Sequence, residues 1–306
     1  MPALPRTLRD RLKDPANWPW LRALEAQARQ GEASALGQLG YQLADEMGLL
    51  RPHPTLSFAY AHAYAAAGSC IGLVNLGEAY LDGTRGRAKD EARGAALLAR
   101  AVALGEPYAM GVLGGCYLRG RGVRRDAVRG VRLVRQGARA GDLWAAEDLA
   151  ELHRVGRVVP KSRRSRMHWL RLTASNFPNC AYDLAVEYER PSDGSRPQPK
   201  RAFQIMKRPA RERHAPAMHA LGWYYDHGFG VRANRRAAIH WYTYSAAAGW
   251  YPINAAASMY NLWGIHSERS DAESVRLAAL WLARAAAGGH EGAQHQILRV
   301  RAKARR

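Results

Sequence analysis

The sequence predicts an all-α solenoid, a stack of helical hairpins, and three observations support this prediction. A Leu-Gly-x-x-Tyr phrase returns along the chain, glycine-containing turns often follow it, and the flanking residues have a helical apolar period. Clean copies stand at Leu76-Gly77-Tyr80, Leu113-Gly114-Tyr117 and Leu221-Gly222-Tyr225. With the degenerate copies included, the Gly/Ala positions are Gly40, Gly77, Gly114, Ala150, Ala185, Gly222 and Ala257, in steps of 35 to 37 residues. That interval is typical of stacked helical repeats.

Length and composition agree with a single elongated array. A chain of 306 residues would ordinarily be expected to divide into two domains, since a single hydrophobic core stops growing near ~250–300 residues. A solenoid avoids this limit because each repeat packs only on its neighbours. The apolar content of 47% is enough for a packed chain, and no run approaches the ~18 apolar residues of a membrane span. We therefore expect one extended unit.

The sixth repeat shows how one unit is built. Ala217, Leu221 and Tyr225 fall four residues apart and form one apolar stripe of a first helix. The glycine beside Leu221 lets a neighbouring helix approach closely, and the paired glycines of residues 226–231 predict a turn. Asn234 is predicted to cap a second helix, since its side-chain oxygen can accept from a free backbone amide. The unit is a helical hairpin.

The order of these residues resembles a known repeat family. Ala-x-x-x-Leu-Gly-x-x-Tyr, then Gly-x-Gly-Val, Asp or Asn, and a helix that ends in Ala-Gly resemble the Sel1-like repeats, relatives of the tetratricopeptide repeats. The resemblance covers residues 31–295 in about seven units. It implies a right-handed superhelix of antiparallel helix pairs that acts as a non-catalytic protein-interaction scaffold or adaptor, for instance in bacterial signalling or secretion. An inhibitor or immunity-type protein that wraps a partner effector is the alternative.

Three units depart from the pattern. The fourth has Ala150 and His153 where clean copies have glycine and tyrosine. The fifth replaces the glycine turn with residues 190–194, so we expect a longer or irregular connection there. The seventh lacks the Gly-x-Gly-Val turn. The second, third and sixth units are therefore the ones that the resemblance describes best.

The two ends fall outside the period. Residues 1–30, which include Trp18-Pro19-Trp20 and a helix-like stretch after it, are predicted to be an N-terminal capping segment. Residues 296–306 are predicted to be a basic C-terminal tail, or the basic continuation of another first helix. Polar outer faces at both ends are what a soluble solenoid requires.

The chain carries a net charge of +20, and we expect much of it on one edge of the stack. The links between the two helices of units three to six, residues 119–126, 154–166, 189–201 and 226–236, together carry +13. Such a basic ridge can steer an acidic partner, or it can be a set of merely solvated arginines. Its densest part supplies four candidate partner-binding residues: Arg157, Arg163, Arg164 and Arg166.

Nucleic acid is the weaker interpretation of this basic ridge. A row of cations could follow a phosphate backbone. However, proteins that bind single strands interleave cations with aromatic stacking platforms, and the arginines of the ridge are not interleaved in this way. The sequence also contains no recognised nucleic-acid module. A protein partner, with an acidic surface, is favoured.

Acidic residues of the first helices in units four and five form the sharpest binding hypothesis. They are two i, i+4 pairs, each on one helix face: Glu147 with Glu151, and Asp183 with Glu187. Together they predict an acidic patch in a groove beside the basic ridge. The alternative is that Arg154 or Arg171 neutralises these acids within the chain, and such surface pairs change stability little.

The equivalent positions of unit six hold His219 and Trp223, and Tyr224 follows. Because tryptophan and tyrosine dominate the energetics of protein interfaces, these residues are predicted to be aromatic anchors for a partner. The alternative is that Trp223 packs against an adjacent unit.

The sequence offers no catalytic, metal or cofactor motif. None of the 11 histidines clusters with cysteine or carboxylate at metal-ligand spacing, and the Gly-x-Gly turns lack the strand and the Gly-Lys-Ser/Thr of a phosphate loop. Cys70, Cys116 and Cys180 lie far apart and are odd in number, which argues against a disulfide framework. We therefore expect a cytoplasmic protein without enzymatic activity or cofactor.

Overall fold

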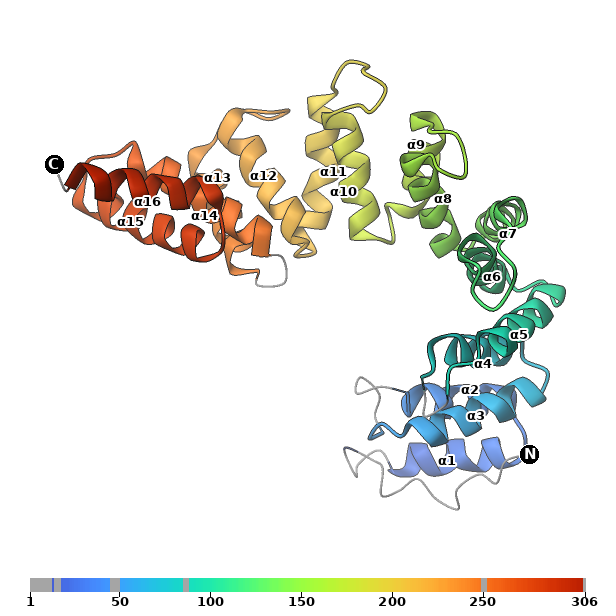
Figure 1. Cartoon of the computed structure of the whole chain (residues 1–306). Helices are drawn as coiled ribbons and strands as arrows, with labels where there is room; N and C mark the ends of the chain where they lie inside the picture. The colour runs from blue at the N-terminus through green and yellow to red at the C-terminus, as the bar shows by residue number, and fades with distance from the viewer. Residues whose placement is uncertain (1–12, 14–17, 45–49, 85–87, 249–251, 305–306) are drawn as a thin grey trace. The chain divides into compact units, whose positions relative to one another are not determined.

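The part of the chain that the structure describes contains sixteen helices joined by turns and links. The computed structural model describes residues 13, 18–44, 50–84, 88–248 and 252–304 (Figure 1). Within these ranges no helix is both long and apolar enough to cross a membrane. The all-α class predicted from the sequence is confirmed.

The chain divides into two compact units, Met1–Pro160 and Lys161–Arg306, where the repeat pattern predicted one. The division falls in the link of the fourth repeat, which lacks the paired glycines of the third and sixth. The first unit contains α1 (Trp18–Arg29), α2 (Ala33–Gln42), α3 (Pro54–Ala66), α4 (Cys70–Asp82), α5 (Glu91–Ala103), α6 (Pro107–Arg119), α7 (Ala127–Arg139) and α8 (Leu143–Val155). The second contains α9 (Arg163–Thr173), α10 (Pro178–Glu189), α11 (Pro199–Arg211), α12 (Ala215–His227), α13 (Arg235–Ala247), α14 (Pro252–Ser267), α15 (Ala272–Ala287) and α16 (Glu291–Ala304).

Consecutive helices pack as the predicted pairs within each unit. In the first unit these pairs are α2 with α3, α4 with α5, and α6 with α7. In the second unit they are α10 with α11, α12 with α13, and α14 with α15. The leucine of the motif is buried in every copy that has one. The solenoid of helix pairs is therefore built on the repeated apolar stripe.

The motif glycine sets how closely the two helices of a pair approach. A Cβ placed on Gly114 would lie 2.6 Å from Val134 Cγ2 and 2.9 Å from the carbonyl oxygen of Gly130, both on α7. A Cβ placed on Gly222 would lie 2.7 Å from the ring of Tyr242 on α13. A side chain at Gly114 would require the α7 backbone to shift, and one at Gly222 would require the ring of Tyr242 to move.

The second glycine of each Gly-x-Gly turn rests against the preceding repeat. A Cβ on Gly122 would overlap the carbonyl oxygen of Glu91, at the start of α5. A Cβ on Gly230 would overlap the carbonyl oxygen of Pro199, at the start of α11. Both glycines have positive φ, +66° and +74°, which a side chain would disfavour. The turn thus fixes the spacing between successive repeats.

In the third and sixth repeats, the cap residue of the second helix makes two hydrogen bonds that hold the start of that helix in place. Asn234 caps α13 as predicted, with Oδ1 accepting from the backbone N–H of Ala237 at 3.0 Å, and Asp126 caps α7 in the same way. The backbone N–H of each cap also donates to the carbonyl of the motif tyrosine, from Asp126 to Tyr117 at 3.0 Å and from Asn234 to Tyr225 at 2.8 Å. These ties connect the end of one helix to the start of the next. In the fifth unit the connection is longer, residues 190–198 against 120–126 in the third, as predicted.

Arginines of the links and second helices bind within the fold. Arg121 Nη2 donates to the Leu81 carbonyl at 2.6 Å and to Asp82 Oδ1 at 3.0 Å, and its Nε donates to Glu91 Oε1 at 3.2 Å. This side chain therefore ties the third repeat to the second. Two other guanidinium groups lie over motif tyrosines, Arg93 over Tyr80 at 4.5 Å and Arg129 over Tyr117 at 4.4 Å.

The ends of the array are helical where the structure describes them. Leu21 and Leu24 of α1 are buried in one cluster with Leu36 and Leu39 of α2. Most of the predicted capping segment before α1 lies outside the described residues. At the other end, α16 runs through residues 296–304, the stretch predicted as a tail, because Ile297 packs on the buried cluster of α15.

A buried ion-pair network joins α9 and α10 in the second unit. Glu187 is 2% exposed and pairs with Arg166, which is also buried. Arg163 Nε lies 3.3 Å from Glu187 Oε2, and its Nη2 donates to the Glu187 carbonyl at 3.1 Å. Two more exposed carboxylates complete the network. Asp183 Oδ2 lies 3.0 Å from Arg166 Nη2, and Asp193 Oδ2 lies 3.2 Å from Arg163 Nη1. Each buried charge therefore has an opposite charge beside it.

We expect Gly114→Ala to destabilise the first unit by about 1–3 kcal/mol, because the new methyl group overpacks the contact with α7. Gly264→Ala is the matched control, since nothing lies within 4 Å of its added Cβ in the last turn of α14. That change should be neutral or stabilising, as alanine favours a helix by up to about 1 kcal/mol. Urea unfolding followed by circular dichroism measures both, and equal effects would contradict the packing role of Gly114.

We expect Glu187→Ala to destabilise the second unit by about 3 kcal/mol, because it leaves buried Arg166 without its nearest counter-charge. The control is Glu151→Ala on α8, whose exposed carboxylate pairs with Arg154 and should contribute within about 1 kcal/mol. The same urea titration compares the two variants. An effect of Glu187→Ala as small as that of Glu151→Ala would show that the network contributes little.

Candidate functional site

A cavity of about 460 Å³ opens between α10 and α12 in the second unit. It is lined by Tyr182, Glu189, Arg190, Pro216, His219, Ala220, Trp223, Tyr224 and Phe229. The end of α10 supplies the acidic and basic groups, α12 supplies most of the aromatic surface, and the turn after α12 adds Phe229. We call this cavity the aromatic pocket.

Three rings of the aromatic pocket contact one another at inclined angles. Trp223 lies 5.6 Å from Phe229 and 6.0 Å from Tyr224, and Tyr224 lies 5.0 Å from Phe229. Trp223 also stacks on His227, at 4.5 Å and 21° between the planes. These contacts limit the rotamers of Trp223, so its ring is held in place before any ligand arrives.

Glu189 is anchored from inside the aromatic pocket. Tyr224 is fully buried, and its Oη donates to Glu189 Oε2 at 2.7 Å. Burial, with this hydrogen bond and the charge of Glu189, raises the pKa of Tyr224 above its usual value. Burial and the charge of Glu189 also raise the pKa of Tyr182. Both tyrosines therefore stay protonated at neutral pH.

His219 connects the aromatic pocket to the next first helix. Its Nδ1 lies 2.9 Å from the Oγ of buried Ser258 on α14. Burial, with a smaller contribution from His290, lowers the pKa of His219 to about 4. The imidazole is therefore neutral near pH 7, and it orients α12 against α14 rather than adding a positive charge.

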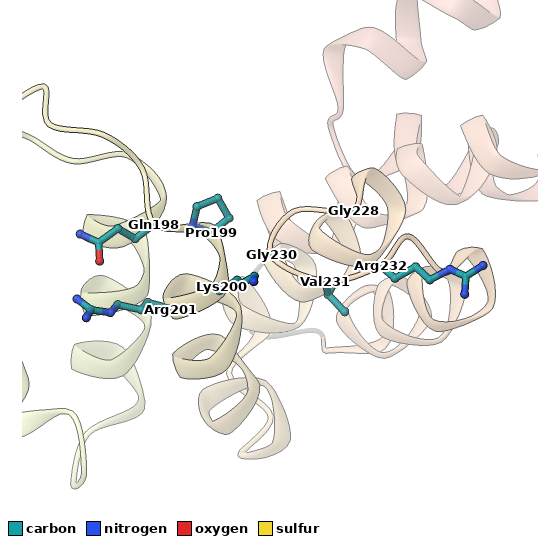
Figure 2. A pocket seen from close by; sticks show the side chains of 8 residues that line it. All are labelled: Gln198, Pro199, Lys200, Arg201, Gly228, Gly230, Val231 and Arg232. Carbon is teal, nitrogen blue, oxygen red and sulfur yellow. The ribbon is translucent and has the colours of Figure 1, made fainter.

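A second hollow, of about 780 Å³, lies where the links of the fifth and sixth repeats meet (Figure 2). Lys200 and Arg201 stand at the start of α11, and Arg232 follows the glycine turn. Figure 2 shows the side chains of Arg201 and Arg232 pointing in opposite directions, away from the space between the links. Arg201 instead lies 5.8 Å over the ring of Tyr188. The links do adjoin here, but their cations do not converge on one anion.

The structure brings three of the predicted site residues together, since His219, Trp223 and Tyr224 all line the aromatic pocket. Sequence reasoning missed Glu189 and Phe229. The repeat alignment contains a signal for Phe229, because the middle residue of the Gly-x-Gly turn is Arg121 in the third repeat and phenylalanine here. Glu189 follows the motif tyrosine directly, where the second repeat has a buried leucine.

The predicted acidic pairs do not occupy equivalent faces. Glu151 stands one residue after the motif Gly/Ala and is exposed, and its Oε2 accepts from Arg154 Nε at 2.6 Å. Glu187 stands two residues after it, the position of fully buried Tyr224, so the helix turns its side chain inward by about 100°. Asp183 and Glu187 thus belong to the network with Arg163 and Arg166. This corrects the expectation that both pairs line an open groove.

The remaining predicted residues lie at the surface or in pairs. Arg157 and Arg164 are exposed, whereas Arg166 is buried. Arg171, an expected partner of the acids, donates instead to Tyr188 Oη at 3.1 Å. Glu147 lies half-buried on α8 of the first unit, and a role in partner binding for the first-unit residues stays a prediction. Among the described residues no three His, Cys, Asp or Glu side chains gather as a metal site would require.

Comparison with solved structures supports the fold. The chain aligns with an antigen of uropathogenic Escherichia coli, c5321, described as having an SLR fold, at 25% identity and a TM-score of 0.69, over 89% of this chain and 57% of that one. It also aligns with a Sel1 repeat protein from Oxalobacter formigenes at 22% identity and a TM-score of 0.61, over 74% of this chain and 99% of that one.

A curated relative is chitin synthase regulatory factor 3 of Schizosaccharomyces pombe, 28% identical over 229 residues. The match takes in 72% of this chain but only 24% of the fungal protein. The family model described as Sel1 repeat matches five stretches, residues 71–106, 107–142, 178–212, 215–250 and 256–290. These stretches cover more than half of the chain and correspond to the second, third, fifth, sixth and seventh predicted units. The chain therefore belongs to the Sel1 repeat family.

Proposed function

We propose that this protein is a non-catalytic scaffold that binds another protein, and that the aromatic pocket is a principal contact. The observation that supports this most is the concentration of aromatic residues around an open cavity. In the third repeat the positions of His219 and Trp223 are held by Gly111 and Gly115. Trp223 is half-buried and packs partly against a cluster of buried residues from α13 and α14, as the alternative interpretation expected, and it also lines the cavity. Rigid aromatic anchors of this kind typically dominate protein interfaces.

The comparisons support a binding role. Repeats of this kind present extended surfaces rather than enclosed active sites. The fungal relative is named as a regulatory factor of an enzyme, which is the kind of role an adaptor performs. Because this chain corresponds to a quarter of that protein, the likeness supports the repeat region as a binding module and not a particular partner.

The internal pairing of arginines favours a protein over nucleic acid as the partner. Arg163 and Arg166, in the densest part of the basic ridge, bind carboxylates of their own unit, and Arg121 ties two repeats together. A phosphate backbone would have to displace these contacts. A cytoplasmic setting and the absence of enzymatic activity are parts of the same proposal.

We expect Trp223→Ala to reduce capture of the partner about 30-fold, the effect of removing a hot-spot tryptophan worth about 2 kcal/mol. Affinity purification from native cells, with mass spectrometry and then titration of the protein captured, measures this. Tyr244→Ala, an exposed aromatic on second helix α13, is the matched control and should leave capture unchanged. Thermal unfolding must show that both variants remain folded. Full capture by the Trp223 variant would remove the aromatic pocket from the interface.

A further inference from the structure

The aromatic pocket contains a carboxylate held in a defined position. Glu189 is 15% exposed and its Oε2 is fixed by the hydroxyl of buried Tyr224, at 2.7 Å. The hydroxyl uses Oε2, so Oε1 is the oxygen that can accept from a cation. A nearly buried carboxylate gains more from a cation than an exposed one, because water screens it less.

The cation now beside this carboxylate is weakly held. Arg190 Nε lies 3.2 Å from Glu189 Oε1, and the arginine side chain is 74% exposed. An ion pair to so exposed a side chain contributes little, since solvent screens it and ordering the long chain opposes it. Arg190 can therefore leave Glu189 when a better-placed cation arrives.

The aromatic rings beside Glu189 provide a surface on which a guanidinium group can stack. Trp223 and Phe229, 5.6 Å apart and inclined at 54°, line the same cavity as the carboxylate. A guanidinium group stacks well on an aromatic face, and tryptophan is the strongest such partner. The same pairing already occurs in this chain, where guanidinium groups lie over Tyr80 and Tyr117 at 4.5 and 4.4 Å.

We propose that the aromatic pocket receives an arginine side chain presented by a partner protein, with its guanidinium against Trp223 and Glu189 and with Arg190 displaced to solvent. This inference rests on the proposed protein-binding function and names the chemistry that the partner must offer. Arginine fits better than lysine because its planar group can stack on a ring and donate to a carboxylate at once. An acidic side chain would instead meet the charge of Glu189.

The net charge of +20 does not oppose a cationic ligand at this site. Screening at physiological ionic strength limits charge effects to about 8 Å, so the groups that line the aromatic pocket decide the outcome. Among them Glu189 and Arg190 carry the charges, and His219 is neutral near pH 7. Once Arg190 leaves, the lining is negative.

The test uses two probes of equal shape, N-acetyl-arginine methylamide and its uncharged citrulline analogue, titrated into the full chain. Binding is followed by the indole NMR signal of Trp223, assigned with Trp223→Phe. We expect the arginine probe to shift this signal with an affinity about tenfold above that of citrulline, the usual strength of a charged hydrogen bond with ring stacking.

Two variants separate the parts of the site. Glu189→Gln keeps an acceptor for Tyr224 and should remove the preference for arginine over citrulline. Arg190→Ala removes the competing cation and should raise the affinity of the arginine probe about threefold. Glu212→Gln, an exposed acid on the same unit that pairs with Arg208, is the matched control and should change neither value.

Equal affinity for arginine and citrulline would overturn the inference, as would weaker binding of arginine to the Arg190 variant. These results are distinguishable from failure of the proposed function. If partner capture still depends on Trp223 while the two probes bind equally, the pocket binds a protein through an apolar side chain. If capture is independent of Trp223, the pocket is not an interface at all.

Discussion

The structure depends on one constraint, the close approach of two helices across a position with no side chain. At Gly114 the backbone of α7, and at Gly222 the ring of Tyr242 on α13, lies within 3 Å of an added Cβ, and the leucine beside each glycine is buried. Once that distance is fixed, the chain must reverse within a few residues, and the free backbone groups at the ends of both helices need hydrogen-bond partners. The glycine turn, the Asp or Asn cap and the hydrogen bond from the cap to the tyrosine carbonyl meet these requirements. The second turn glycine then places one pair against the next. Because each helix pair meets the same requirements, the same residues return in successive repeats.

The helix pairs and their caps could be predicted because they depend on neighbours in the sequence. Asn234 caps the helix that its position indicated, Asp126 caps the equivalent helix of the third repeat, and the longer fifth link was visible from the loss of its glycine turn. The side of the helix on which an acid lies was predictable in principle. Glu151 and Glu187 differ by one position relative to the motif, and that single step separates an exposed carboxylate from a buried one.

The contacts that long arginine side chains make could not be predicted from the sequence. Arg121 reaches groups 30 to 40 residues away, and Arg163 and Arg166 reach α10 from the preceding helix. A count of charges places these residues on one edge but cannot show that their guanidinium groups turn inward. Arg121, Arg163 and Arg166 of the basic ridge therefore join helices and repeats within the fold. Basicity of the chain is consequently a poor guide to the charge of its partner.

The aromatic pocket arises from substitutions that leave the pairing contact untouched. In the first unit Arg121 fills the junction between the second and third repeats by binding Asp82 and Glu91. The equivalent residues of the second unit are Phe229, Arg190 and Pro199, which cannot form those bonds. Phenylalanine packs instead on Trp223, and Glu189 is satisfied by Tyr224. A repeat can thus exchange a polar tie for a cavity at its junction, because the glycines and leucines that hold the pair lie on other faces of the same helices.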